Sequence, residues 1–138
     1  MTFYPEALQE LVEEFQEVDD KRERLEMLFE LAEEIVVLPA SEWSDNTRVR
    51  GCQSEAHVRV SVEEGLVHFF GAADAKLVQG LMGVLSIAIE GLTPAQAVLI
   101  PVDFAQEMGL TNTLTPSRSN GFRNMYDKVM NEIRASAE

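Results

Sequence analysis

Apolar residues recur at helical spacing in the first third of the chain. One stretch predicts an amphipathic helix over about residues 5–18, with its apolar positions three or four apart: Leu8, Leu11, Val12 and Phe15. A second stretch repeats the pattern: Leu25, Leu28, Phe29, Ala32, Ile35 and Val36. Asp19 and Asp20 lie between them, where aspartate suits a helix N-cap. The short connection predicts an antiparallel helix pair.

The pattern changes to strict alternation in the middle of the chain. Residues 57–62 read His-Val-Arg-Val-Ser-Val, which predicts a strand with the valines facing the core and the polar residues, His57 among them, facing solvent. Residues 63–65 predict a turn, and residues 66–70 predict a second, more buried strand. Val49 is a candidate for a short third strand, which places Cys52 in the connection between Val49 and the hairpin.

Helical spacing returns after the hairpin. Residues 77–89 are apolar on most sides and predict a central buried helix, with Asp74 as its N-cap and Gly91 as its stop. Gly80 and Gly83 weaken a helix, so we expect them to allow close packing against a neighbour.

The last third of the chain completes the predicted fold. Residues 93–96 fit a capping box with proline at the first helical position. An apolar stripe then predicts a final helix: Phe122, Met125, Tyr126, Val129, Met130 and Ile133. No βαβ alternation occurs. The sequence therefore predicts an α+β fold, in which a small antiparallel sheet of two to three strands packs with the N-terminal helix pair, the central buried helix and the C-terminal helix.

Length and charge limit the classes of function. The chain has 138 residues, so a single domain over residues 1–138 is expected. The net charge is -13, and residues 1–42 supply thirteen acidic against three basic residues, which disfavours nucleic acid as a partner. This acidity is typical of solvated helix surfaces, and it can also orient a protein partner. No secretory signal pattern and no apolar stretch long enough for a membrane span is visible, so we expect a soluble, cytoplasmic protein.

Cys52 is the only cysteine, and its surroundings suggest chemistry. A lone cysteine forms no internal disulfide and no multi-thiolate zinc site, which leaves a structural thiol, a redox switch, or a nucleophile and carrier. Gly51 permits a sharp turn, and Gln53 and Ser54 suit a loop. The chain also has a cluster of basic residues around this cysteine: Arg48, Arg50 and Arg59. Cations stabilise the thiolate, which is the reactive form of the side chain.

Several cysteine chemistries do not fit this spacing. A phosphatase loop needs an arginine six residues after the cysteine, where this chain has Val58. A cysteine protease needs a histidine base, and neither His57 nor His68 lies in a recognisable protease context. Glycine-rich phosphate-binding loops are absent from the sequence. We therefore expect the protein to carry no pyridoxal phosphate, no stoichiometric metal and no other cofactor of its own.

Three segments resemble the SufE family of sulfur acceptor proteins, which serve cysteine desulfurases in iron–sulfur cluster assembly. Residues 51–54, Gly-Cys-Gln-Ser, resemble the active-site loop of that family. Residues 114–121, Leu-Thr-Pro-Ser-Arg-Ser-Asn-Gly, are similar to a second family segment. Asp74, Ala75 and residues 78–81 resemble the start of a family helix. The segments occur in the family order, so the resemblance covers essentially the whole chain.

The resemblance implies a compact α+β fold with Cys52 on a loop, tucked inward at rest and exposed on docking. Cys52 would take sulfur from a pyridoxal-phosphate-dependent cysteine desulfurase and pass it to an iron–sulfur scaffold complex. The chain would stimulate the desulfurase and have no independent small-molecule activity.

Three residues near the expected site have more specific roles to be tested. Arg118 is expected to support transfer, since a cation near a helix start breaks a local rule. Two positions depart from the family pattern: His57 replaces a usual aromatic residue, often tryptophan, and Arg50 replaces a neutral one. Both are expected to affect the partner surface.

Two other functions remain open at this point. One is a thiol redox or peroxide-sensing protein that uses Cys52 through a sulfenic acid, although such proteins often have a second, resolving cysteine. The other is an interaction module in which the cysteine is incidental.

Overall fold

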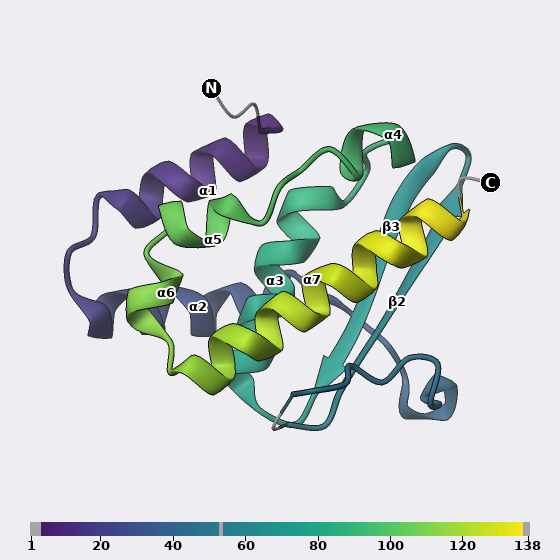
Figure 1. Ribbon diagram of the computed structural model, residues 1–138, viewed down its shortest axis with the longest axis horizontal. Helices are drawn as coiled ribbons and strands as arrows, with labels where there is room; N and C mark the ends of the chain where they lie inside the picture. The colour runs from purple at the N-terminus through teal and green to yellow at the C-terminus, as the bar shows by residue number, and fades with distance from the viewer. Residues whose placement is uncertain (1–3, 53, 137–138) are drawn as a thin grey trace.

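A three-stranded sheet with helices packed against it forms the framework of the computed structural model, which describes residues 4–52 and 54–136. The elements in chain order are α1 (Glu6–Gln16), α2 (Lys21–Leu31), η1 (Ala32–Glu34), β1 (Val36–Val37), η2 (Ala40–Glu42), β2 (Ala56–Glu63), β3 (Leu66–Ala73), α3 (Lys76–Ile89), α4 (Pro94–Ala97), α5 (Asp103–Glu107), α6 (Leu110–Thr113) and α7 (Pro116–Ser136) (Figure 1). The predicted α+β class is confirmed.

The hairpin of β2 and β3 forms the main part of the sheet, whose strand order is β1-β3-β2. Glu63 pairs with Leu66, and the two residues between them have positive φ angles, 55° at Glu64 and 79° at Gly65. A two-residue turn of this kind matches the twist of the paired strands. The predicted turn and both predicted strands are confirmed.

The third strand differs from the sequence prediction. Val36 pairs with Phe70 in a parallel arrangement, so the sheet is mixed, whereas the apolar spacing placed Val36 on the second helix. The helix α2 ends at Leu31, and one short turn separates it from β1. The β-branched residues at positions 35–37 favour a strand, and Pro39 restricts Leu38 to an extended conformation.

Val49 lies beside the sheet without extending it as a named strand. Its N–H donates to the carbonyl of Ala56 at 2.8 Å, and the N–H of Val58 donates to the carbonyl of Thr47 at the same distance. Arg48 and His57 form an isolated antiparallel bridge. The segment before Cys52 is therefore attached to the start of β2.

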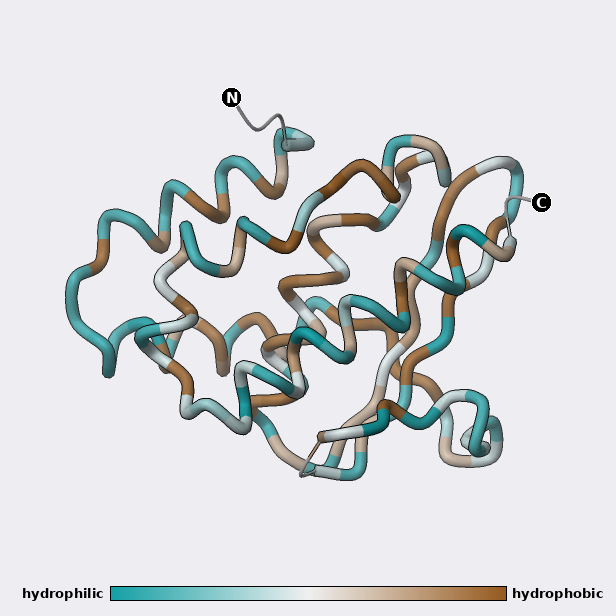
Figure 2. Tube along the Cα trace, in the orientation of Figure 1, coloured by the Kyte–Doolittle hydropathy of each residue, from teal (hydrophilic) through white to brown (hydrophobic). Residues whose placement is uncertain are grey.

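The helix α3 is the centre of the core, as its composition predicts. Figure 2 shows its trace as largely hydrophobic, whereas α1 alternates along its length. A Cβ atom added at Gly80 would overlap the carbonyl oxygen of Leu28, and one added at Gly83 would overlap that of Leu31. The predicted close packing is confirmed, and the neighbour is α2.

The helix ends agree with prediction in three places and differ in one. Asp20 accepts a hydrogen bond from the N–H of Arg22 at 3.0 Å and caps α2. Thr93 forms the predicted capping box of α4, and Gly91 has the positive φ of 79° that suits a helix stop. The prediction that Asp74 caps α3 is wrong, because Ala75 is the N-cap and no side chain caps this end.

The N-terminal helices and α7 enclose α3 from different sides. Both α1 and α2 pack mainly against α3, and α1 also contacts α5. The helix α7 crosses β2 and α3, as Figure 1 shows, with one face buried: Gly121, Phe122, Met125, Val129, Met130 and Ile133. Within the described residues, no helix has the length and apolar character that a membrane crossing requires.

Candidate functional site

Cys52 lies on the loop before β2 and packs against the first half of α7. The cysteine is half-buried and borders a small pocket that α3 and α7 form. We call this the Cys52 pocket, and its other lining residues are Val78, Leu81, Ser117, Arg118, Gly121, Phe122 and Met125. It contains no space for a water-sized sphere. The partial shielding of Cys52 at rest agrees with the sequence-based expectation.

Gly51 gives the loop its close approach to α7. Its φ angle is +75°, a conformation that residues with a Cβ rarely adopt. An added Cβ would also overlap the side-chain amide of Asn124 on α7. The predicted sharp turn at Gly51 is confirmed, and the loop needs glycine here both for its backbone conformation and for its packing.

Arg118 connects α7 to the loop on the other side of Cys52. Its Nη1 donates to Ser54 Oγ at 2.7 Å, although the two residues are 64 positions apart. The backbone N–H of Arg118, near the start of α7, donates to Thr115 Oγ1 at 3.3 Å, so this N–H already has an acceptor within the protein. Gln53, the remaining loop residue proposed from the sequence, lies outside the described residues.

The basic cluster proposed from the sequence is distributed differently. Arg48 pairs with Glu55 at 2.6 Å, and Arg59 pairs with Glu42 at 3.2 Å. Arg50 and Gly51 line a separate cleft of about 810 Å³ between the loop and the second half of α7. Arg118 is the arginine that lines the Cys52 pocket, so the arginine of this pocket comes from α7 and not from the proposed cluster.

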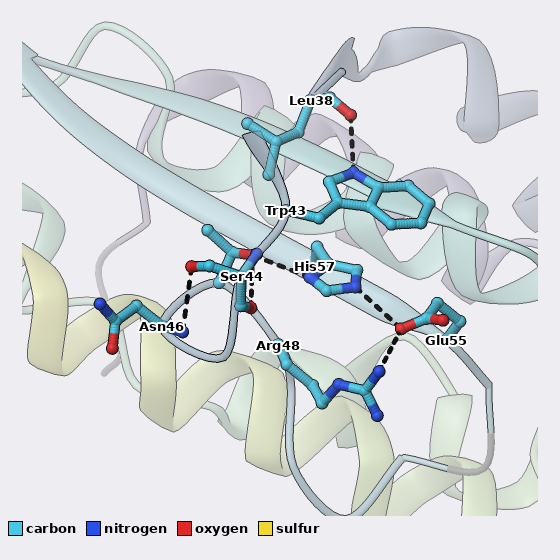
Figure 3. A network of polar contacts seen from close by, with 8 residues as sticks. Leu38, Trp43, Ser44, Asn46, Arg48, Glu55 and His57 are labelled. Atoms are coloured by element: carbon cyan, nitrogen blue, oxygen red, sulfur yellow. Dashed lines mark hydrogen bonds and ion pairs between the residues drawn. The ribbon is translucent and has the colours of Figure 1, made fainter. Parts of the chain in front are cut away.

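His57 is buried, and the prediction of a solvent-facing strand residue is wrong. Only 3% of it is exposed, because residues before Cys52 fold over this end of the sheet (Figure 3). Its ring stacks on Trp43, with centroids 4.5 Å apart and planes inclined by 13°. His57 Nε2 contacts Glu55 Oε2 at 2.9 Å, and Nδ1 contacts Thr47 Oγ1 at 2.8 Å.

Three residues near the site were missed by the sequence analysis: Trp43, Glu55 and Asn124. Glu55 directly follows the Gly-Cys-Gln-Ser segment, and that adjacency is a signal that could have identified it. Trp43 and Asn124 carry no such signal, because folding alone brings them near the loop.

Tyr126 attaches α7 to the segment between α4 and α5. Its hydroxyl donates to the carbonyl of Ile100. Burial raises the pKa of Tyr126 above its ordinary value, and the nearby Arg134 partly opposes this increase. The neutral phenol is thus favoured over the phenolate and keeps its proton for the hydrogen bond.

No group of three or more His, Cys, Asp or Glu side chains among the described residues is placed to hold a metal ion. The groups gathered at the Cys52 pocket are the Cys52 thiol, Arg118 and the loop that α7 and the sheet hold in place.

Comparison with known proteins gives a consistent result. A family model described as "SufE: Fe-S metabolism associated domain" matches residues 9–133. An uncharacterized SufE-like protein of Synechocystis is 35% identical over 95% of this chain and 82% of its own length. A protein of Arabidopsis thaliana, named SufE-like protein 1, chloroplastic/mitochondrial, is 33% identical over 88% of this chain, which spans only 33% of the plant protein. The solution structure of a hypothetical protein from Thermus thermophilus superimposes with a TM-score of 0.84 at 26% identity, covering 98% of each chain.

Proposed function

The chain belongs to the SufE family, whose domain is associated with iron–sulfur metabolism, and we propose that it accepts sulfur on Cys52 from a cysteine desulfurase and delivers it to an iron–sulfur scaffold complex. The desulfurase supplies the pyridoxal phosphate in this scheme, and the present chain contributes the thiol. A cytoplasmic location remains a prediction, since the name of the plant relative refers to organelles.

The observation that carries this proposal is the position of Cys52. Its loop lies against α7, Cys52 is half-buried, and the Cys52 pocket is largely apolar. A persulfide is easily lost to free thiols and oxidants, so a carrier benefits from a cysteine that is covered between dockings. A catalytic thiol that acts on small molecules would instead need an open substrate pocket beside it, and the Cys52 pocket has no room for even a water molecule.

The transfer step itself is a thiol–persulfide exchange. The Cys52 thiolate attacks the outer sulfur of the persulfide on the desulfurase cysteine. A new S–S bond forms at Cys52 while the S–S bond on the desulfurase breaks, and the desulfurase cysteine leaves as a thiolate. One persulfide is consumed and one is formed, so the step needs no external oxidant or reductant.

Arg118 and the loop have supporting roles in this scheme. Arg118 holds Ser54, two residues after Cys52, and so helps to position the loop that carries the thiol. Docking must move the loop away from α7, because the sulfur has to meet a second cysteine. Gly51 supplies the backbone freedom for such a movement.

The deciding experiment follows labelled sulfur from cysteine through the desulfurase to this chain. We expect covalent label on the wild-type chain and none on Cys52→Ser, since Cys52 is the only cysteine. The modified chain is also identified by its mass, but a persulfide and a sulfinic acid have nearly the same mass. Each sample is therefore treated with a thiol reductant, which removes sulfur from the persulfide only. Label on the serine variant, or an adduct that resists the reductant, would contradict sulfur acceptance and would favour the redox function in the second case.

A further inference from the structure

Glu55 connects the Cys52 loop to a group of buried side chains. Its carboxylate Oε2 accepts hydrogen bonds from Arg48 Nη2 at 2.6 Å and from His57 Nε2 at 2.9 Å (Figure 3). Its backbone carbonyl accepts from the N–H of Asp74 at 3.1 Å. Glu55 therefore marks the point at which the loop after Cys52 becomes fixed to the sheet. We call Thr47, Arg48, Glu55 and His57 the Glu55 cluster.

The two hydrogen bonds to Glu55 are not equivalent. The Arg48 side chain is 52% exposed and that of Glu55 is 37% exposed, so their ion pair is screened by solvent and contributes little. The His57 side chain is only 4% exposed. If Glu55 moved away, Nε2 of His57 would remain buried without an acceptor, which is costly.

Thr47 and Trp43 keep the His57 ring in place if the loop moves. Nδ1 of His57 contacts Thr47 Oγ1 at 2.8 Å, and Thr47 is itself held by Ser44, whose carbonyl accepts from the hydroxyl at 3.0 Å and whose N–H donates to it at 2.9 Å. Trp43 stacks on the ring, and its own Nε1 donates to the carbonyl of Leu38 at 3.0 Å. The His57 ring is thus held by its contact with Thr47 and by its stacking on Trp43. Because the ring stays in place, its hydrogen bond to Glu55 can hold the loop.

The loop has two further attachments, and both reach α7. Arg118 holds Ser54, and Gly51 packs against Asn124. Cys52 lies between them. Backbone hydrogen bonds from Val49 to Ala56 and from Asp74 to Glu55 flank the loop, and the Glu55 cluster is the side-chain attachment that joins it to the sheet side of the molecule.

We propose that Glu55 and His57 are positioning residues that hold Cys52 in its pocket, and that loss of the His57–Glu55 hydrogen bond releases the loop while the rest of the fold stays intact. This inference rests on the proposed function of Cys52, since it assigns the control of exposure to residues near the same thiol. Neither residue touches the sulfur.

The test measures how fast Cys52 is alkylated in the free protein, without any desulfurase. Because the chain has one cysteine, the rate reports on this thiol alone. Glu55→Ala should raise the rate about tenfold, the ratio that about 1.4 kcal/mol of lost loop stability produces. Glu55→Gln keeps an acceptor oxygen for His57 and should restore most of the slow wild-type rate.

Glu42→Ala is the matched control. Glu42 also pairs with an arginine, Arg59, at 3.2 Å, and its side chain is 42% exposed, but Arg59 lies on β2 and not on the Cys52 loop. Its alkylation rate should equal that of the wild type. Trp43 is the only tryptophan, so its emission should change in Glu55→Ala and His57→Gln and stay unchanged in Glu42→Ala.

Two outcomes would overturn the proposal. Equal alkylation rates for Glu55→Ala and Glu42→Ala would show that the carboxylate does not hold the loop. Alkylation that increases only in proportion to a lower global stability in urea would show a general structural role. If Glu55→Ala does not fold, His57→Phe takes its place, because phenylalanine keeps a ring against Trp43 but has no donor for Glu55, so the rate should again rise about tenfold. An unchanged rate in that variant would count as the first of these outcomes. The assay does not involve sulfur transfer, so its result and that of the labelling experiment can fail independently.

Discussion

Two close contacts in this molecule differ in kind, because backbone atoms make one of them and side chains make the other. Between α2 and α3, the backbone of one helix touches glycines of the other, at Gly80 and Gly83. Between the Cys52 loop and α7, side chains make the connections, through Arg118 and Asn124. A contact between two backbones can be broken only by moving a whole helix, whereas a side-chain contact can be broken by rotating one side chain. The core is therefore fixed, whereas the loop is held by contacts that can be reversed.

Gly80→Ala should have the largest effect, because it breaks the fixed contact. Its Cβ would overlap the backbone carbonyl of Leu28, which cannot rotate away as a side chain would. We expect the free energy of unfolding to fall by about 3 kcal/mol, the upper part of the range for overpacked cores.

Urea unfolding checks this value against Gly91→Ala. An added Cβ at Gly91 has nothing within 4 Å, so that variant should lose only the strain of its positive φ, about 1 kcal/mol. Equal losses in the two variants would contradict the view that α2 and α3 are fixed by backbone contact.

Gly51→Ala should act on the loop and leave the core intact. An alanine at φ +75° is strained by about 1–2 kcal/mol, and its Cβ would press on the amide of Asn124. Since the loop can shift, we expect roughly tenfold faster alkylation of Cys52 and a melting temperature lower by only a few degrees. The double variant Gly51→Ala/Asn124→Ala removes the overlap but keeps the strain. If the double variant alkylates at the wild-type rate, the strained φ has no effect on the loop.

Arg118→Ala removes one of the reversible contacts. The hydrogen bond from Arg118 to Ser54 is partly exposed, so the melting temperature should stay almost unchanged. Stimulation of the desulfurase should fall several-fold, since Ser54 loses the arginine that holds the loop next to Cys52. Arg123→Ala serves as the control, because the Arg123 side chain is 61% exposed and pairs with Asp127 on its own helix. If Arg118→Ala still stimulates the desulfurase fully, Arg118 is only a surface residue. If the variant unfolds, the role of Arg118 is structural.

Gly121→Ala should have the smallest effect, and in the opposite direction. The new Cβ would lie 3.6 Å from Cys52 Sγ, an ordinary contact, while the helix α7 gains about 0.5–1 kcal/mol. We expect a slightly higher melting temperature and slower alkylation. The neighbouring variant Asn120→Ala improves helix propensity at an exposed position, so it should raise the melting temperature without changing the alkylation rate. The same alkylation rate in both variants would show that position 121 does not cover the thiol.

Local rules explain most of what could be predicted from the sequence. The turn at Gly65, the capping box at Thr93 and the close packing at Gly80 each depend on a few neighbouring residues, and each is confirmed. The strand β1 was missed because its residues continue the helical spacing of α2. At this point β-branched residues and the following proline outweigh the periodic pattern.

The candidate site could be predicted only in part for the same reason. Cys52 and Gly51 lie in one recognisable segment, and Arg118 lies in another. Alternation gave the wrong environment for His57, because it describes the strand alone and not the loop that folds over it. The contacts of Glu55 with His57 and Arg48 involve neighbours in sequence, yet only the path of the loop brings their side chains together.

If Cys52 carries sulfur as proposed, the tight fit of the Cys52 pocket has a consequence for recognition. A sulfur atom is larger than a water molecule, and the pocket has no space for a water-sized sphere. The outer sulfur of a persulfide on Cys52 would therefore lie on the exposed side of the thiol or displace the loop. In either case the surface around Cys52 would differ between a loaded and an empty chain, and a scaffold that recognises this difference would select loaded chains.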